Sequence, residues 1–321
     1  MLQACEEAFI DDSPANDPQN NFDILWTTLD EKYSLFPIKK LDWDSVYAAF
    51  SPRIYPEMSD EELFAVMDSM LYLLRDGHTN LVSDFNVSRN WEWYLNYPDN
   101  FNYELVERNY LGNNHRIAGG LRYTILEGNL GYIYYGSFSS GFSRANLNEV
   151  MTYLQNTEGL IFDIRNNGGG RLNNAFVLAQ LFAPEEQPVI YRFYKTGPGH
   201  NEFDKSVTVS LGPSAGVNYT KPVALLTNRR VYSAANTFAG IMGLFPKVTL
   251  IGDRTGGGGG LPVDSELPNG WTYRYSATRE FTVQGTNLER GIPPNIQKDL
   301  DSTAVLNGRD NIIETAIDWL K

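Results

Sequence analysis

The sequence predicts an α/β fold, in which a helical module precedes a core built on a largely parallel sheet. After residue 121, short apolar segments alternate with helical ones, which is the pattern of strand–helix–strand crossovers. Before residue 86, apolar residues recur at spacings of three and four, as on one face of an amphipathic helix. The 321 residues, 42% of them hydrophobic, suffice to bury a core without disulfides or a structural metal.

Residues 1–20 are expected to form a flexible tether. The chain from residue 6 to residue 20 is acidic and polar, and it offers too little apolar surface to pack. The only cysteine, Cys5, stands just ahead of this segment, after a small residue. This arrangement resembles the mature start of a bacterial lipoprotein. It implies a lipid anchor on Cys5 and a location in the bacterial cell envelope, in the periplasm or at the outer membrane. The alternative is a stray thiol in a mobile terminus.

Residues 21–85 are expected to form the helical module. Ser59 and Glu62 have the spacing of a capping box and predict the start of its third helix. Gly77 then fits the C-terminal cap of that helix. Residues 86–120 are rich in aromatic residues, Asn and Gly, and are expected to be connecting strands and loops.

Residues 121–321 are expected to form the core, because strand and helix signals alternate there. In open parallel sheets, functional residues tend to lie where strands end and helices begin. The predicted strands are residues 131–135, 160–164, 223–227 and 248–251, and the predicted helices are residues 146–154, 172–182 and 233–244.

Composition excludes several classes of partner. The 26 Lys and Arg residues against 39 Asp and Glu residues give a net charge of −13, so nucleic acid and anionic membranes are poor partners. The three histidines are far apart, which predicts no metal site. No run approaches the roughly eighteen apolar residues of a spanning helix. Contact with a membrane would therefore go through the anchor at Cys5.

Two strand-to-helix turns could carry chemistry. Residues 163–170 end in three glycines, whose backbone N–H groups could hold an anion or a developing oxyanion. The alternative there is a plain tight turn. Neither a G-x-G-x-x-G spacing nor a lysine follows, so no nucleotide cofactor is expected. Ser233 stands where the next buried strand turns into a helix, which resembles a nucleophile elbow without its glycines; the alternative is an N-cap serine.

Two further places could supply acid–base groups. His78 lies just past a predicted helix end and could act as a general base. His115 and His200 also lie in loops, and a solvated loop histidine is the alternative for all three. Glu289 could orient a histidine, or it could form a surface salt bridge with Arg290 or another cation.

Short motifs occur in order along nearly all of residues 22–296. They are Phe22-Asp23-x-x-Trp26, Asp42-Trp43-Asp44, Leu74-Arg75-Asp76-Gly77-His78-Thr79, Asp163-x-Arg165-Asn166-Asn167-x-Gly169-Gly170, Ser233-Ala234-Ala235, Ile251-Gly252-Asp253-Arg254-Thr255-Gly256-Gly257 and Glu289-x-Gly291-Ile292-x-Pro294. In this order they resemble the tail-specific or C-terminal-processing serine peptidases, in the branch of the tricorn protease core. The resemblance implies a crotonase- or ClpP-like α/β core.

The resemblance also implies roles for single residues. One design of the family uses a Ser–Lys dyad, but Gly258 occupies the lysine's place here. The tricorn type uses serine, histidine and glutamate, which implies Ser233 as nucleophile, His78 as general base and Glu289 as the indirect orienter of the imidazole. The N–H groups of Gly169 and Ala234 would then form the oxyanion hole.

The chain departs from the family pattern at several positions. Gly77 replaces a serine that links histidine to glutamate, and Thr79 is a possible substitute. Asn236 and Asn295 replace a frequent glutamate and a frequent aspartate, and Asn236 could support the site. The roughly thirty-five residues between module and core are too few for a PDZ domain. Substrate choice is therefore expected to rest on the core cleft, where an edge strand near residues 256–263 could pair with an extended peptide.

The function expected from these observations is hydrolysis of peptide bonds by a serine peptidase without a cofactor, acting on peptides or unfolded proteins. The first alternative is a non-catalytic module that binds peptides or other ligands on the same fold. A second alternative is a crotonase-like acyl-CoA enzyme, which does not account for serine, histidine and glutamate at peptidase positions.

Overall fold

The computed structural model describes residues 14–321, so Cys5 and most of the predicted tether lie outside the described residues. The chain divides into two compact units, and each contains segments that are distant in sequence. Unit 1 comprises the described residues up to Glu92, Tyr194–Lys205 and Leu261–Thr278, and unit 2 comprises Trp93–Phe193, Ser206–Gly260 and Arg279–Lys321.

Unit 1 begins with the predicted helices. Ser59 starts α4, which is the predicted third helix, with a complete capping box: its hydroxyl accepts from the backbone of Glu62, and the Glu62 carboxylate accepts from the backbone of Ser59. The helical elements are α1 (Pro18–Lys32), α2 (Phe36–Lys39), α3 (Trp43–Phe50), the 3-10 turn η1 (Ser51–Arg53) and α4 (Asp60–Tyr72).

The prediction that Gly77 caps this helix is wrong. Helix α4 ends at Tyr72, and the chain then tightens into successive three-residue turns, in which Leu73 and Leu74 donate to carbonyls three residues back. Arg75 then takes the left-handed conformation, with φ of 47°. These turns satisfy the last helical carbonyls, so the helix ends without a glycine.

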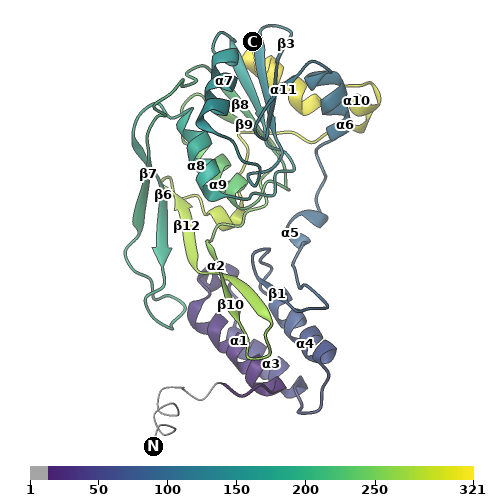
Figure 1. Ribbon diagram of the computed structural model, residues 1–321, viewed down its shortest axis with the longest axis vertical. Helices are drawn as coiled ribbons and strands as arrows, with labels where there is room; N and C mark the ends of the chain where they lie inside the picture. Colours follow the sequence, from purple (N-terminus) through teal and green to yellow (C-terminus); the bar gives the residue numbers. More distant parts are fainter. Residues whose placement is uncertain (1–13) are drawn as a thin grey trace, which may run out of the picture. The chain divides into compact units, whose positions relative to one another are not determined.

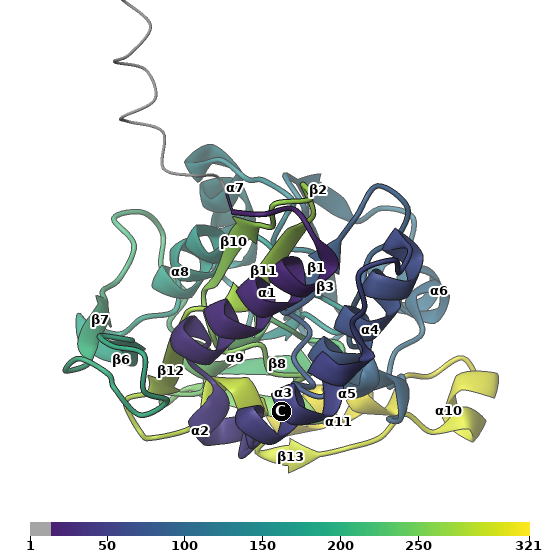
Figure 2. The same ribbon diagram turned by 90° about the horizontal axis from the view of Figure 1, so that it is seen from below.

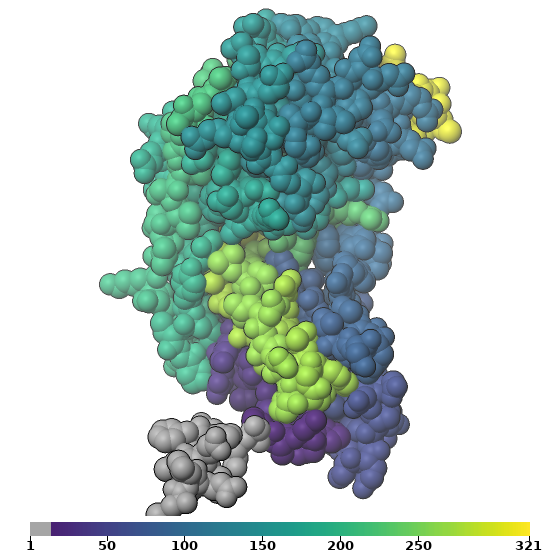
Figure 3. All heavy atoms as spheres, viewed as in Figure 1, coloured from purple at the N-terminus to yellow at the C-terminus, as the bar shows by residue number. Residues whose placement is uncertain are grey.

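The helices of unit 1 pack on a small antiparallel sheet of order β1-β11-β10 (Figures 1 and 2). Its strands are β1 (Asn80–Val82), β10 (Pro262–Glu266) and β11 (Thr272–Ser276). Phe22 and Leu25 of α1 belong to the same apolar cluster as Trp271 and Tyr273 of the β10–β11 hairpin. The outer side of this hairpin, yellow-green in Figure 3, is largely exposed.

Unit 2 contains a seven-stranded sheet of order β13-β9-β8-β5-β4-β3-β2 (Figure 1). Strands β13, β9, β8, β5 and β4 run parallel, which confirms the predicted parallel core, and β3 and β2 continue it antiparallel. The strands are β2 (Arg116–Ala118), β3 (Leu121–Leu126), β4 (Leu130–Tyr135), β5 (Gly159–Asp163), β8 (Val223–Thr227), β9 (Val248–Gly252) and β13 (Ile296–Gln297).

Helices cover both faces of this sheet, so unit 2 has three layers (Figure 1). Helices α7 (Arg144–Leu154), α8 (Leu172–Gln180) and α9 (Ala234–Met242) pack on one face. Helices α6 (Tyr103–Val106) and α11 (Asn311–Leu320) pack with the other. The α/β fold class predicted from the sequence is confirmed.

The remaining elements connect or flank these layers. They are α5 (Glu92–Leu95), the π-helix η2 (Glu107–Leu111), the small sheet of β12 (Thr278–Thr282), β6 (Gln187–Tyr194) and β7 (Val207–Leu211), the 3-10 turn η3 (Leu288–Arg290), and α10 (Ser302–Leu306). The edge strand predicted near residues 256–263 is wrong in its first part. Residues 256–260 form no strand, and β10 begins only at Pro262. Gly256 and Gly258 lie against the Trp93 and Tyr232 rings, and Gly257 and Gly259 lie against the backbone of Glu289.

Candidate active site

Three loops of unit 2 meet beyond the carboxyl ends of β5, β8 and β9. Asn166 and Asn228 join the first two loops, since the Asn166 backbone N–H donates to Asn228 Oδ1 at 2.9 Å and Asn228 Nδ2 donates to Asn166 Oδ1 at 2.6 Å. The Tyr232 N–H donates to the carbonyl of Asn167 at 3.1 Å, and the Ser233 N–H donates to the carbonyl of Gly257 at 2.9 Å. The three loops are therefore held together through main-chain and amide bonds.

Ser233 stands at the turn from β8 into α9 in a strained backbone conformation. Its φ is 55° and its ψ is −126°, a region that residues other than glycine rarely adopt and that costs about 1–3 kcal/mol. Its side chain is half-buried and makes no capping hydrogen bond to α9. Ser233 therefore does not serve as a side-chain N-cap. The strained turn instead favours a nucleophile elbow, in which the hydroxyl is exposed at the head of a helix.

Gly169 lies directly against this serine. A Cβ on Gly169 would lie 2.8 Å from Ser233 Cβ and 3.0 Å from the Ala234 nitrogen, so glycine alone fits there. The Gly169 N–H donates to Asn167 Oδ1 at 3.0 Å. The Ala234 N–H, at the first turn of α9, has no acceptor among the hydrogen bonds of residues 14–321. Of the two predicted oxyanion donors, the Gly169 N–H thus already has an acceptor, and the Ala234 N–H has none among the described residues.

A buried ion cluster fixes the start of the glycine turn. Arg165 is fully buried and pairs through Nη2 with Asp163 at 2.6 Å and through Nη1 with Asp310 at 2.9 Å. The Tyr132 hydroxyl also donates to Asp163, at 2.8 Å. Sequence reasoning missed Asp310, whose only local signal is its position just before a helical segment. Asp310 also forms the N-cap of α11. Its ion pair with Arg165 therefore links that helix to the end of β5.

The glycine-rich loop after β9 passes through a space too narrow for side chains. A Cβ on Gly256 would lie 2.4 Å from the Trp93 ring, and one on Gly257 would lie 2.1 Å from the Glu289 carbonyl oxygen. Gly258 has φ of +80°, and a Cβ there would lie 2.6 Å from the Tyr232 ring. The position that carries lysine in the dyad design is thus covered by an aromatic ring.

Glu289 lies on η3 beside this glycine loop. Its Oε2 accepts the N–H of Gly259 at 3.0 Å, and Asn236 Nδ2 donates to the preceding carbonyl, that of Leu288, at 2.9 Å. The Thr255 hydroxyl, fully buried, donates to Asn236 Oδ1 at 2.6 Å and accepts the N–H of Ile292 at 2.6 Å. Asn236 and Thr255 therefore hold the turn that carries Glu289. From the sequence, Thr255 is recognised only as part of the glycine-rich motif, and this role is not predicted.

His78 belongs to unit 1, where a carboxylate organises its turn. The His78 backbone N–H donates to Asp76 Oδ1 at 2.8 Å. Asp76 Oδ2 accepts the hydroxyls of Tyr33 at 3.0 Å, Thr79 at 3.2 Å and Ser276 at 3.0 Å. The hydroxyl of Thr79, predicted as a possible support, thus contacts Asp76. Sequence reasoning also missed that Asp76 organises this turn, although an acid two residues before a histidine could have suggested it.

The electrostatics of unit 1 favour a neutral imidazole. Burial lowers the pKa of His78 below its ordinary value, and the cations Arg274 and Lys39 act in the same direction, while Asp76 opposes them. Burial acts to raise the pKa of Asp76, but Lys39, His78 and the hydrogen bonds to the carboxylate outweigh it, so this pKa lies below its usual value. A neutral histidine beside a charged carboxylate is competent as a general base.

Unit 2 brings together five of the predicted residues around the glycine loop: Gly169, Ser233, Ala234, Asn236 and Glu289. His78 and Thr79 lie in unit 1, and the approach of His78 to Ser233 stays a prediction. The other two histidines have partners of their own. His115 Nδ1 lies 2.7 Å from the carbonyl of Gly112, and His200 Nε2 lies 2.7 Å from Asp30 Oδ1.

Residues 14–321 contain no group of three or more His, Cys, Asp or Glu side chains that could hold a metal ion. In the same part of the chain, no helix combines the length and apolar character needed to cross a membrane.

Two family profiles match parts of the chain. The profile of Peptidase family S41 matches residues 129–298, more than half of the chain, and that of the Tricorn protease C1 domain matches residues 14–72. The chain belongs to peptidase family S41. The predicted resemblance to tail-specific serine peptidases is therefore confirmed, and the S41 match covers the β5, β8 and β9 loops described above.

The S41 chain is similar to several named proteins. It is 44% identical to a protein of Parabacteroides merdae that is provisionally named a peptidase, with a TM-score of 0.91 over 95% of this chain and 97% of that one. It is 27% identical to the carboxy-terminal processing protease CtpA of Bacillus subtilis over 183 residues. That match covers 56% of this chain and 37% of CtpA, so the chain matches well under half of that relative's length.

More distant solved structures share the fold of this S41 chain. Mature CPAF, at 12% identity, superposes with a TM-score of 0.69 over 95% of the chain. The tricorn protease, at 15% identity, superposes with a TM-score of 0.57 and is covered over 36% of its length. At these identities the likeness concerns the fold alone.

Proposed function

We propose that this S41 chain is a serine peptidase that hydrolyses peptide bonds with Ser233 as its nucleophile. The observation that carries the proposal is the strained turn of Ser233 (φ 55°) at the head of α9, with the open N–H of Ala234 beside it. A hydroxyl held on such a turn next to an unused donor is what attack on a carbonyl requires. Membership of family S41 supports the same chemistry.

In the proposed mechanism, His78 acts as the general base. Its imidazole removes the Ser233 proton as the hydroxyl attacks the peptide carbonyl, then protonates the departing amine. Water repeats the cycle on the acyl-enzyme. Because burial lowers the pKa of His78, the imidazole is neutral and ready to accept a proton at neutral pH. The charge of Asp76 stabilises the imidazolium that forms, and Glu289 acts as the indirect orienter.

The proposed oxyanion hole uses two backbone donors of unequal readiness. Ala234 offers its N–H at the helix N-terminus, where the helix dipole also favours negative charge. Gly169 offers the second N–H, which must exchange its bond to Asn167 Oδ1 for the oxyanion. Each donor contributes about 3 kcal/mol of barrier reduction in related chemistry.

The base is proposed to be histidine because the lysine of the other design has no room here. A side chain at Gly258 would meet the Tyr232 ring at 2.6 Å, and the backbone there is left-handed, with φ of +80°. No lysine lies between Lys247 and Lys298. The substrates proposed are peptides or unfolded proteins, in keeping with the S41 relatives named as processing proteases.

A fluorophosphonate probe tests the nucleophile directly. Wild-type protein should be labelled on Ser233, and Ser233→Ala should lose the label, while Ser302→Ala, an exposed serine on α10, should keep it. His78→Ala should slow labelling strongly. Absence of labelling in the wild type, together with absence of casein hydrolysis at every pH tried, would favour the non-catalytic binding module instead.

We also propose a lipid anchor at Cys5 and a location in the bacterial cell envelope. The support is the position of Cys5 ahead of an acidic polar segment. Growth with an alkyne-bearing fatty acid should label the wild type, and Cys5→Ser should remove the label. A wild-type protein that stays unlabelled would overturn the anchor without touching the peptidase proposal.

A further inference from the structure

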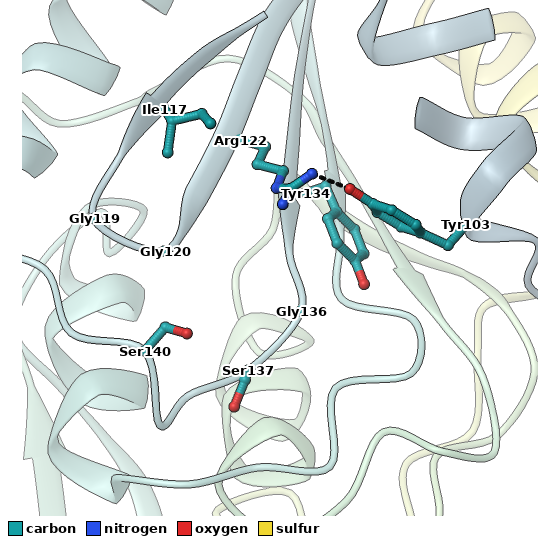
Figure 4. A pocket seen from close by; sticks show the side chains of 9 residues that line it. All are labelled: Tyr103, Ile117, Gly119, Gly120, Arg122, Tyr134, Gly136, Ser137 and Ser140. Carbon is teal, nitrogen blue, oxygen red and sulfur yellow. Dashed lines mark hydrogen bonds between the residues drawn. The ribbon is translucent and has the colours of Figure 1, made fainter. Parts of the chain in front are cut away.

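Unit 2 contains a pocket of about 430 Å³ that the mechanism above does not use (Figure 4). It lies at the end of β4, between the β2–β3 hairpin and the loop that follows β4. Its lining residues are Tyr103, Ile117, Gly119, Gly120, Arg122, Tyr134, Gly136, Ser137 and Ser140.

Glycines keep this pocket open. A Cβ on Gly120 would lie 2.4 Å from Ser140 Cβ, so the hairpin turn can approach the loop only as glycine. A Cβ on Gly136 would lie 2.8 Å from the Tyr134 hydroxyl, which lies over that residue. The Tyr134 ring is held from behind, stacked on Phe101 at a centroid distance of 5.6 Å. The pocket wall is thus set by packing.

The polar groups of the pocket are mostly hydrogen-bond donors. Arg122 Nη1 donates to the Tyr103 hydroxyl, shown as a dashed line in Figure 4, and to Glu107 at 2.9 Å. The other N–H groups of Arg122 and the hydroxyls of Tyr134 and Ser140 have no acceptor among the hydrogen bonds of residues 14–321. No carboxylate is among the lining residues. Burial raises the pKa of Tyr134, so its hydroxyl stays protonated.

The pocket borders the proposed oxyanion turn. The Phe138 N–H, one residue after Ser137, donates to the carbonyl of Gly169 at 2.9 Å. A Cβ on Gly169 would in turn lie 2.8 Å from Ser233 Cβ. The loop that lines the pocket is therefore hydrogen-bonded directly to the glycine turn that contacts Ser233. An extended peptide advances about 3.3 Å per residue, so a peptide bound at Ser233 reaches this neighbouring pocket within a few residues.

We propose that this pocket is a substrate subsite that binds a peptide carboxylate about three residues from the scissile bond. The inference rests on the proposed function, because it takes Ser233 as the nucleophile. An arginine with free N–H groups and neighbouring hydroxyls matches a carboxylate, which only accepts hydrogen bonds. Glu107 pairs with Arg122 through Nη1 alone, so a substrate carboxylate would use the remaining N–H groups of the guanidinium. The carboxylate comes from an Asp or Glu side chain or from the peptide's C-terminus.

The test uses a peptide that the enzyme itself selects. A peptide released from casein and identified by mass spectrometry is extended across its cleavage site and synthesised in matched forms. One form has an acidic residue three positions from the scissile bond, one has the corresponding amide residue, one ends there in a free carboxylate, and one ends there in a carboxamide. Cleavage is measured as kcat/KM with wild-type enzyme, and binding is measured by fluorescence polarisation with Ser233→Ala.

Arg122→Gln is the informative variant, and Arg116→Gln is its matched control. Arg116 lies on the neighbouring strand β2 and pairs with Glu149, but it does not line the pocket. Wild-type enzyme should prefer the carboxylate form over its amide by about ten- to hundredfold in kcat/KM, as expected for a charge-assisted hydrogen bond. Arg122→Gln should reduce that ratio to near one, and Arg116→Gln should keep it. Thermal denaturation checks that both variants fold.

The outcomes separate the subsite from the catalytic proposal. Preference for the side-chain form alone, or for the C-terminal form alone, identifies the source of the carboxylate. Equal cleavage of acid and amide forms by an enzyme that labels at Ser233 would overturn the subsite and leave the peptidase proposal standing. A preference that survives Arg122→Gln would likewise overturn it. Failure of Ser233 labelling in wild type would instead refute the proposed function.

Discussion

The packing around Gly258 gives the sharpest quantitative prediction. Gly258→Ala adds one methyl group where φ is +80° and where that methyl would lie 2.6 Å from the Tyr232 ring. The left-handed backbone costs a residue with a Cβ roughly 1–2 kcal/mol. The clash with the ring adds about 1–3 kcal/mol, as for overpacking in a dense interior. We therefore expect a loss of about 2–5 kcal/mol in the free energy of unfolding.

A double-mutant cycle separates these two contributions. Tyr232→Ala removes the ring, so Gly258→Ala in that background should retain the backbone cost and lose the clash. The cycle should then show a coupling of about 1–3 kcal/mol. Thermal denaturation provides the measurement, because each kcal/mol shifts the midpoint by about 2–4 °C for a unit of this size. A Gly270→Ala variant serves as control, since it also has positive φ (+86°) but no neighbouring atom within 4 Å.

Two results would refute this reasoning. If Gly258→Ala is no worse than Gly270→Ala, the ring does not occupy the space where the lysine of the dyad design would begin. If the cost of Gly258→Ala is the same with and without the Tyr232 ring, the clash is not its cause. Gly258→Lys should also fail to create a Ser–Lys enzyme in a His78→Ala background, and recovery of peptide hydrolysis there would contradict the packing argument.

Three further predictions concern single groups. Arg165→Met should lower the free energy of unfolding by about 3–5 kcal/mol, because it leaves the buried carboxylates of Asp163 and Asp310 without their cation. Thermal denaturation measures this loss, and a loss below about 1 kcal/mol would show that the ion pairs do not stabilise the fold. The pH profile of kcat/KM should reach half its maximum below pH 6.5, because burial lowers the pKa of His78. Asp76→Asn should move that midpoint to lower pH, since the charge of Asp76 raises this pKa. A midpoint that moved to higher pH would exclude His78 as the base. Thr255→Val should reduce kcat more than it raises KM in steady-state assays, because each buried hydrogen-bond partner left unsatisfied costs about 1–3 kcal/mol. Thr255→Ser keeps the hydroxyl and should retain kcat. An equal loss in both variants would show that the hydroxyl does not position Glu289.

The parts of the fold that could be predicted are those whose signal is local. Strands β5, β8 and β9 are nearly all buried and apolar, so each reads as a short continuous run bounded by polar turns. The turn after β5 and the serine before α9 follow directly from where such strands end. The capping box of Ser59 was likewise readable, because both of its partners lie within four residues.

The parts that could not be predicted depend on partners far apart in the chain. Arg165 meets Asp310 across 145 positions, and the Ser276 hydroxyl meets Asp76 across 200. Nothing near residues 262–276 indicates that this hairpin completes the sheet of unit 1 by pairing with β1. The prediction of Gly77 as a helix cap is wrong for a related reason, since three-residue turns after α4 satisfy the last helical carbonyls and no sequence pattern indicates these turns.

The glycine run after β9 connects these observations to the choice of base. Its residues lie in close contact with the Trp93 and Tyr232 rings and with the backbone of Glu289. That packing holds Glu289, through the Gly259 N–H, and receives the Ser233 N–H at the carbonyl of Gly257. The same packing leaves no space for a lysine side chain at Gly258, so the proposed catalysis by Ser233 needs a proton acceptor from another segment. We propose His78 for this role, since burial lowers the pKa of its imidazole and keeps it neutral. A His78→Ala variant that labelled at the wild-type rate would refute that assignment.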